Sequence, residues 1–172
     1  DRPDEIRQSV LDIATDWLAV GIDPSKSAML IQSEVPAIDE LTFFFSMLIP
    51  FNRVMRNPTL AQEIKDKELG DKYPFGFPLY AVGQTADILS FRPDVVPVGE
   101  DQLPHLELTR EVARRFNQIY CGVDPQTEDK DYINAGGLLP IIQPRLGRVK
   151  RLVGLPGDTL AIPVFAWHQY FC

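Results

Sequence analysis

The segment Val95-Val96-Pro97-Val98-Gly99-Glu100-Asp101-Gln102 decides the fold class of this chain. Its apolar residues 95–98 predict a short strand. The backbone hydrogen bonding of this strand is expected to be incomplete, because Pro97 has no backbone N–H to donate. Gly99 supplies the turn, and a helix is expected to begin near Asp101, with Pro104 in its first turn. A strand that passes through glycine into a helix is typical of parallel sheets whose carboxyl edge binds ligands.

The pattern on both sides of this segment alternates between helix and strand. Apolar residues at helical spacing predict helices over residues 6–18, after Pro36, over residues 80–89 and onward from Asp101. An unbroken apolar run at residues 28–31 predicts a second strand that is buried on both faces. The order of these elements predicts an α/β domain in which helices and a mostly parallel sheet form layers.

Three further stretches have simpler interpretations. The polar residues 57–70 predict a solvated connection with a short helix over residues 59–64. The run Phe43-Phe44-Phe45 fits a core or an oligomer interface. The helix that begins near Asp101 is expected to bury Leu108, Val112, Phe116 and Ile119.

Composition narrows the class of protein. The chain has 172 residues, of which 45% are hydrophobic and 24% charged, so one domain or at most two are expected and a disordered or fibrous protein is excluded. Two cysteines fit a reducing compartment, and no apolar run is long enough to span a membrane, so we expect a cytoplasmic protein. The chain lacks an initiator methionine and begins as if cut from a longer one.

The net charge of −7 means that contact with RNA or phosphate requires a local basic patch. Four cations near the C-terminus, Arg145, Arg148, Lys150 and Arg151, are the candidates for such a patch. The same residues also fit the solvated edge of a strand. Two cysteines and two histidines without ligand spacing exclude a structural zinc site.

A carboxylate lies within the predicted helix over residues 80–89. Asp87 is surrounded by small and apolar residues, where a charge is costly unless it is paired. Tyr80 and Gln84 precede it by seven and three residues and so share its side of the helix. The three groups fit the polar end of an aromatic pocket. The alternative is an aspartate that faces solvent on an amphipathic helix.

The turn after residue 98 has two interpretations as well. Gly99 would let a ligand approach the backbone, and Asp101 and Gln102 would bind ribose hydroxyls or other polar groups. Alternatively, Glu100 and Asp101 are simply residues that commonly start helices.

His105 follows on the helix and either faces this site or is an ordinary half-buried histidine. His168 has no serine or cysteine partner in a recognisable motif, so no catalytic triad is assigned.

Five ordered motifs are more specific than any of these features alone: GIDP at 21–24, IQSEVP at 31–36, ADIL at 86–89, VPVGEDQ at 96–102 and HLELTR at 105–110. Together they resemble tryptophanyl-tRNA synthetase, a class I aminoacyl-tRNA synthetase, in a match that runs from about residue 2 to 153. The resemblance implies a Rossmann-like catalytic domain, incomplete here at its N-terminal side. It assigns residues 1–154 to that domain and leaves residues 155–172 as a divergent apolar segment of unknown role.

The resemblance also implies roles for individual residues. Asp87 matches the carboxylate that accepts the indole N–H of tryptophan, Tyr80 and Gln102 match groups that hold the substrate amino group, and Gln84 lines the pocket. Gly99, Glu100, Asp101 and Val149 match the part of the site that contacts ATP. No catalytic residue and no metal ligand is assigned. An acceptor that indole alone satisfies would discriminate against phenylalanine, which leaves it unpaired.

The reaction implied by the resemblance is activation of L-tryptophan with ATP, with Mg²⁺, and its transfer to tRNA(Trp). The family also implies a homodimer, with residues 32–36 near its subunit boundary. The HIGH and KMSKS signatures that handle phosphate are absent from this sequence. We therefore expect little or no ligase activity from this chain alone. Two alternatives stay open: a non-catalytic module for tryptophan binding or dimerisation, and an adenylating enzyme for another aromatic amino acid.

Overall fold

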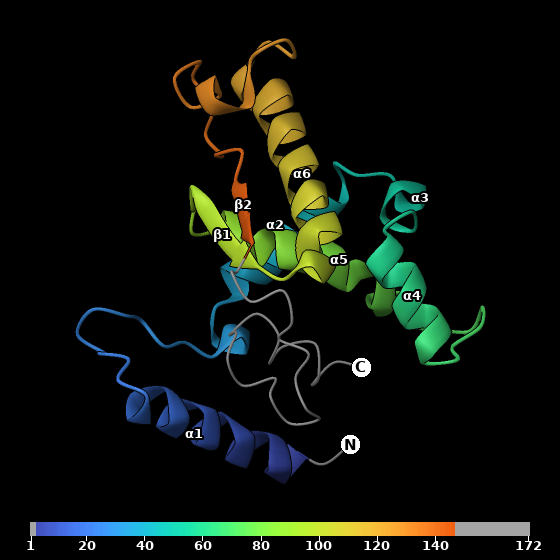
Figure 1. Cartoon of the computed structure of the whole chain (residues 1–172). Helices are drawn as coiled ribbons and strands as arrows, with labels where there is room; N and C mark the ends of the chain where they lie inside the picture. Colours follow the sequence, from blue (N-terminus) through green and yellow to red (C-terminus); the bar gives the residue numbers. More distant parts are fainter. Residues whose placement is uncertain (1–2, 147–172) are drawn as a thin grey trace. The chain divides into compact units, whose positions relative to one another are not determined.

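The computed structural model describes residues 3–146, which fall into two compact units, residues 3–36 and residues 37–146 (Figure 1). The first unit contains the helix α1 (Pro3–Ala19) and the 3₁₀ turn η1 (Gln32–Glu34). Asp4 and Glu5 lie in the first turn of α1, where negative charge stabilises the helix. Gly21 follows the helix with φ of +96°, a conformation that favours glycine. The predicted helix and its end are confirmed.

The strand predicted at residues 28–31 is wrong. These residues form no regular element, and the side chains of Leu30 and Ile31 are about half exposed, at 44% and 50%. A strand exists only where a neighbour completes its backbone hydrogen bonds, and an apolar run does not reveal whether a neighbour is present. The apolar run was therefore not sufficient to predict a strand at residues 28–31.

The second unit contains five helices, two strands and two 3₁₀ turns within its described residues. In chain order they are α2 (Pro36–Ser46), α3 (Phe51–Val54), α4 (Pro58–Asp66), α5 (Gly76–Leu89), β1 (Val95–Val98), η2 (Glu100–Gln102), α6 (Leu103–Cys121), η3 (Asp129–Asp131) and β2 (Gln143–Leu146). The first residue of α2, Pro36, closes the first unit. The strand at 95–98, the helix from about 101 and a short helix within 57–70 are thus confirmed.

The sheet of this unit consists of β1 and β2, which pair in parallel with Val95 opposite Gln143 and Val98 opposite Leu146 (Figure 1). The parallel arrangement agrees with the predicted α/β class, although only two strands are present in the described residues. Arg145 lies exposed on β2, so it belongs to a solvated strand edge. Arg148, Lys150 and Arg151 lie outside the described residues, as does the predicted domain boundary at 154.

The core of the unit is built mainly by α5 and α6. Small residues on α5, among them Ala81 and Ala86, are fully buried and allow close packing. Leu108 and Val112 of α6 are buried as predicted. Ile119 is 55% exposed, contrary to the prediction, because the last turns of α6 extend beyond α5 (Figure 1).

The Phe43-Phe44-Phe45 run is divided between core and surface. Phe45 is buried and meets the ring of Phe116 edge-on at 6.2 Å between ring centroids, whereas Phe43 and Phe44 are exposed.

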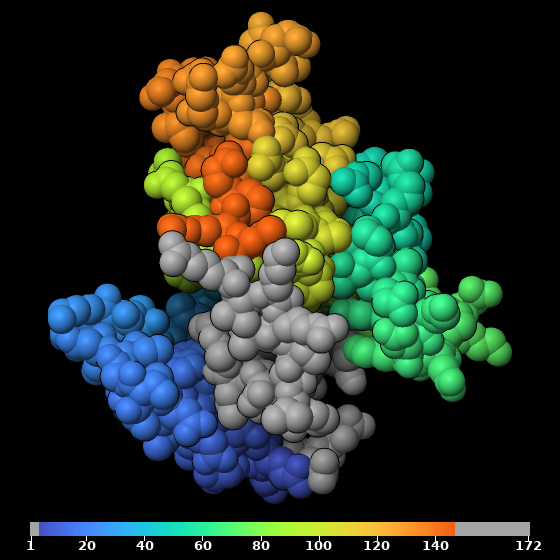
Figure 2. All heavy atoms as spheres, in the orientation of Figure 1, coloured from blue at the N-terminus to red at the C-terminus, as the bar shows by residue number. Residues whose placement is uncertain are grey.

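The segment after α6 folds back along the C-terminal part of that helix (Figure 2). Among the described residues, no helix is both long enough and apolar enough to cross a membrane.

Candidate functional site

The helix α5 carries three of the predicted site residues. It begins at Gly76, four residues before the predicted start, so Tyr80 lies inside the helix. Intervals of four and three residues place Tyr80, Gln84 and Asp87 on one side of it. Gln84 is buried, and Tyr80 and Asp87 are half-buried.

Asp87 has the electrostatic character expected of a carboxylate in a restricted environment. Desolvation by burial, with a smaller contribution from the carboxylate of Asp39 on α2, raises the pKa of Asp87 to about 6. The side chain is therefore not the fully solvated aspartate of the alternative interpretation. A carboxylate with a raised pKa is stabilised by any N–H donor that approaches it.

A chain of side-chain hydrogen bonds joins α5 to the turn η2. Gln84 Nε2 donates to Gln102 Oε1 at 3.1 Å, and Gln102 Nε2 donates to Asp101 Oδ2 at 2.8 Å. Because a carboxylate accepts only, Asp101 fixes the direction of the whole chain. Gln84 Oε1 remains at the other end, buried and without a hydrogen-bond partner in the described part of the molecule. A buried acceptor without a donor is costly, so a ligand that supplies one is favoured there.

Gly99, at the start of the turn, leaves space that a side chain in its place would fill. Its φ of −77° is open to any residue. A Cβ on Gly99 would stand 2.6 Å from Asp101 Oδ1, far below van der Waals distance. The glycine therefore makes room for the carboxylate of Asp101. Glu100 and Asp101 are themselves exposed, and Val149 lies outside the described residues.

Within the described residues, the helix α4 or its cap contacts α5, η2 and α6, and the sequence did not predict these contacts. Glu63 accepts a hydrogen bond from the Tyr80 hydroxyl at 3.0 Å, and Thr59 Oγ1 donates to the backbone carbonyl of Asp101 at 2.8 Å. Asn57, just before the helix, contacts His105 of α6. The short helix predicted within residues 57–70 is present, and its start is fixed by the cap motif Asn-Pro-Thr at 57–59.

His105 is a buried residue whose tautomer the structure determines. Asn57 Oδ1 accepts from the backbone N–H groups of Thr59 and Leu60, so its Nδ2 is the donor toward His105 Nδ1, at 3.2 Å. Nδ1 is therefore the acceptor and a neutral His105 carries its proton on Nε2. The ring lies 5.7 Å from the ring of Tyr80. His105 thus helps to hold the side of α5 that carries the site.

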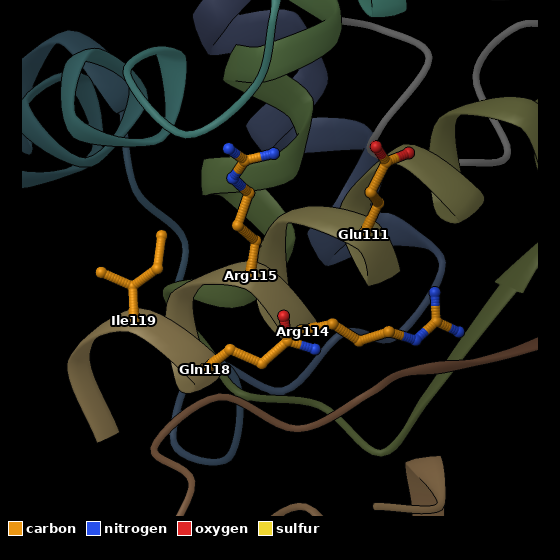
Figure 3. Close-up of a pocket in the computed structure, with 5 residues that line it drawn as sticks. All are labelled: Glu111, Arg114, Arg115, Gln118 and Ile119. Atoms are coloured by element: carbon orange, nitrogen blue, oxygen red, sulfur yellow. The ribbon is translucent and has the colours of Figure 1, made fainter. Parts of the chain in front are cut away.

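No group of three or more His, Cys, Asp or Glu side chains in residues 3–146 could hold a metal ion. A hollow of about 410 Å³ lies along α6, away from the predicted site residues, and is lined by Glu111, Arg114, Arg115, Gln118 and Ile119 (Figure 3). Figure 3 shows Arg114 pointing away from Arg115 and Ile119. Arg114 pairs with Asp129, and Glu111 pairs with Arg53 at 2.7 Å. The charges of Arg114 and Glu111 are therefore already paired within the chain.

Known proteins are similar to this chain over most of its length. The family model described as tRNA synthetases class I (W and Y) matches residues 1–135. The chain is 48% identical over 140 residues to the tryptophan–tRNA ligase of Clostridium longisporum, a match covering 80% of this chain and 41% of that protein. It is 41% identical over 158 residues to the tryptophan–tRNA ligase of Streptococcus pneumoniae, covering 91% and 43%. The chain therefore spans about two-fifths of these relatives.

A solved structure confirms the fold class. The tryptophanyl-tRNA synthetase of Campylobacter jejuni, crystallised with ADP and tryptophan, superposes with a TM-score of 0.70 at 26% identity, over 87% of this chain and 41% of that one. The predicted Rossmann-like α/β fold, present in part, is thus confirmed, and so is the resemblance to tryptophanyl-tRNA synthetase. The chain belongs to the class I tRNA synthetases of the W and Y family.

Proposed function

We propose that this chain supplies the tryptophan pocket and part of the ATP site of a tryptophan–tRNA ligase. The complete reaction activates L-tryptophan with ATP and transfers it to tRNA(Trp). The relatives that support the proposal are themselves tryptophan–tRNA ligases, over the region that this chain matches. The structural support is the arrangement of Tyr80, Gln84 and Asp87 along one side of α5, with Gln84 hydrogen-bonded to Gln102 of η2.

Asp87 would recognise the indole ring. Its carboxylate is the acceptor for the single polar hydrogen of indole, and burial makes that acceptor costly when it is left without a donor. Phenylalanine brings no donor, and tyrosine brings its hydroxyl to a different place. Such a mismatch in a buried polar site discriminates strongly between substrates. The pocket would therefore select tryptophan through one hydrogen bond and the fit of an aromatic ring.

Gln84, Gln102 and Tyr80 would hold the amino group of the substrate. The unpartnered Oε1 of Gln84 is an acceptor at the end of a directed chain of hydrogen bonds, and an ammonium is a strong donor. The same chain ends on Asp101, in the segment 99–101 that would contact the nucleotide. The two halves of the site are thus connected through Gln102.

The reaction needs positioning and charge neutralisation more than a covalent catalyst. In the first step, an oxygen of the tryptophan carboxylate attacks the α-phosphorus of ATP and pyrophosphate leaves. Mg²⁺, where it takes part, would be held chiefly by the phosphates, as this cation commonly is. Asp101 and Glu100 would face the ribose, and Val149 would contact the adenine. A homodimer would be the functional assembly.

The binding step is tested by calorimetry of the 172-residue chain with L-tryptophan, L-phenylalanine and 1-methyl-L-tryptophan. We expect L-tryptophan to bind best, because the other two lack the indole N–H. Asp87→Asn should remove most of this preference, whereas the exposed Asp71→Asn should retain it. Equal binding of all three ligands, or no binding of tryptophan, would contradict the proposal.

Tryptophan-dependent exchange of pyrophosphate into ATP tests the activity itself. The sequence holds neither the HIGH nor the KMSKS signature, so we expect weak or no exchange by this chain alone. Clear turnover would overturn that expectation while leaving the pocket assignment intact. Tight tryptophan binding without exchange would be the behaviour of a non-catalytic tryptophan-binding module.

A further inference from the structure

We infer that Glu63 is a positioning residue that turns the oxygen of Tyr80 into an acceptor for the ammonium group of the amino-acid substrate. The inference rests on the proposed function, in which Tyr80 contacts that group, and it adds a residue from a helix that carries no predicted site residue. It starts from one contact: the Tyr80 hydroxyl lies 3.0 Å from Glu63 Oε2 and donates to it.

The direction of that hydrogen bond follows from the chemistry of its partners. A carboxylate has no proton to offer, so the phenol must be the donor. Once its proton points toward Glu63, the phenol oxygen offers lone pairs to other groups. An ammonium has three N–H donors and no acceptor, so it matches this oxygen and would be mismatched with a phenol that points its proton outward.

Glu63 also brings a negative charge to this end of the predicted pocket. Its carboxylate accepts from the phenol hydroxyl, so its charge would attract a substrate ammonium through the phenol oxygen that lies between them. Hydrogen bonds that form part of such a chain polarise one another and become stronger. The half-buried state of both Glu63 and Tyr80 reduces screening by solvent.

The position of Glu63 is determined by contacts on the same helix. The start of α4 is capped by Asn57, whose Oδ1 accepts from the backbone N–H groups of Thr59 and Leu60 at 3.0 and 3.4 Å. Leu60 is fully buried, and Thr59 donates to the Asp101 carbonyl. Glu63 lies one helical turn after Thr59, on the same side of α4. A single helix thus holds both the turn that carries Asp101 and the carboxylate behind Tyr80.

The ring of Tyr80 is held as firmly as its hydroxyl. The Phe77 ring meets it edge-on with 5.6 Å between ring centroids, and the centroid of the His105 ring, on α6, lies 5.7 Å from that of Tyr80. His105 is fixed in turn by Asn57. These contacts restrict the ring, so the remaining freedom of Tyr80 is rotation of its O–H bond. Glu63 accepts that O–H and so favours one rotation of it.

Three ligands separate this role from a merely structural one. L-tryptophan and tryptamine carry the ammonium, and indole-3-propionate lacks it while keeping the indole and the carboxylate. Calorimetry with the full 172-residue chain should show that Glu63→Ala weakens binding of the first two by about 10- to 100-fold, the range for a hydrogen bond to a charged group. Binding of indole-3-propionate should be unchanged or slightly tighter, because a repelling charge has been removed.

Two further variants make the test independent of folding defects. Glu63→Gln keeps an acceptor for the phenol but removes the charge, so its loss of ammonium binding should be smaller than that of Glu63→Ala. Asp66→Asn removes a charge from the same helix at an exposed residue bonded to Gln62, and should change none of the three affinities. Tyr80→Phe combined with Glu63→Ala should bind no worse than Tyr80→Phe alone, because Glu63 acts through Tyr80.

The outcomes are distinct. Equal loss of all three ligands in both Glu63 variants, or no change for the ammonium ligands, would overturn the role of Glu63 and leave the tryptophan pocket intact. Failure of the unmodified chain to bind L-tryptophan and tryptamine would overturn the proposed function and this inference together. Selective loss of the two ammonium ligands would support both.

Discussion

Oδ1 of Asp101 lies 2.6 Å from the point where a Cβ on Gly99 would stand, so the carboxylate occupies space that only glycine leaves open. The backbone at Gly99 is extended and would accept any residue. The sequence suggested that this glycine admits a ligand to the backbone. The structure adds a second role, because the glycine also leaves room for the Asp101 side chain, which accepts from Gln102.

Gly99→Ala should therefore affect the site more than the fold. The clash is with the end of a side chain that can rotate away, so we expect the free energy of unfolding to change by less than about 1 kcal/mol. Asp101 would lose its hydrogen bond from Gln102, and tryptophan affinity should fall by about 3- to 10-fold. Calorimetry and urea unfolding measure the two effects. Gly76→Ala, where a Cβ meets open space, is the control, and a large loss of stability in Gly99→Ala would contradict this account.

Asp87 should make stability depend on pH. Its pKa is raised from 3.8 to about 6 in the folded chain, so the folded state binds this proton more tightly than the unfolded state. Stability therefore falls as pH rises from about 4 to about 6.5 and then levels off, at a cost of order 2–3 kcal/mol. Asp87→Asn lacks this decline.

Urea unfolding of both proteins across this pH range measures the difference. Asp39→Asn should retain most of the decline, because burial of Asp87 contributes more to the shift than the Asp39 carboxylate. Parallel pH profiles for Asp87→Asn and the unmodified chain would refute the assignment. Tryptophan affinity should rise over the same interval, since the ionised carboxylate is the better acceptor for indole.

An ionic cluster holds the segment after α6 against that helix. Asp129 accepts from Arg114 at 2.8 Å through both oxygens and also from Arg110. The hydrogen bond from Arg114 is the largest cause that lowers the pKa of Asp129 below 3.8, so its stabilisation is present above that pH and is lost as pH falls through the lowered value.

Asp129→Asn should reduce the free energy of unfolding at neutral pH by about 1–3 kcal/mol, because two half-buried guanidinium groups lose a charged acceptor. Glu128→Gln removes the neighbouring pair with Lys130, whose side chains are more than 70% exposed, and should cost less than about 0.5 kcal/mol. Equal effects of the two substitutions in thermal or urea unfolding would refute this ranking.

Asn117 is the buried link between α6 and the segment that leads to β2. Its Oδ1 accepts from the N–H groups of Leu138 and Leu139 at 2.8 and 3.0 Å, and its Nδ2 donates to the Leu139 carbonyl at 2.6 Å. Asn117→Ala leaves three backbone groups without these partners and should destabilise the chain by about 2–5 kcal/mol. Asn134→Ala, at an exposed residue, is the control. Hydrogen exchange at Leu139 should accelerate in the first variant only.

The elements predicted correctly are those whose signal is local. The periodicity of residues 6–18 and 80–89, the glycine after β1 and Pro104 all act within a few residues, so α1, α5, β1 and the start of α6 were recognisable. The strand β2 was not recognisable, because Gln143-Pro144-Arg145-Leu146 has no apolar run. It is a strand only because β1 lies beside it. The error at residues 28–31 has the same cause: the apolar run is present there, but no strand pairs with it in the described residues.

The candidate site divides along the same line. The sequence alone determined the residue types at 80, 84, 87 and 102 and the family to which their motifs belong. Motifs and their spacing can be identified without any knowledge of which residues are in contact. The tertiary structure alone decided that Gln102 connects Gln84 to Asp101, that Glu63 stands behind Tyr80 and that Asn57 sets the tautomer of His105. Each of these contacts joins residues from different elements, and only the packing of those elements determines which polar groups meet.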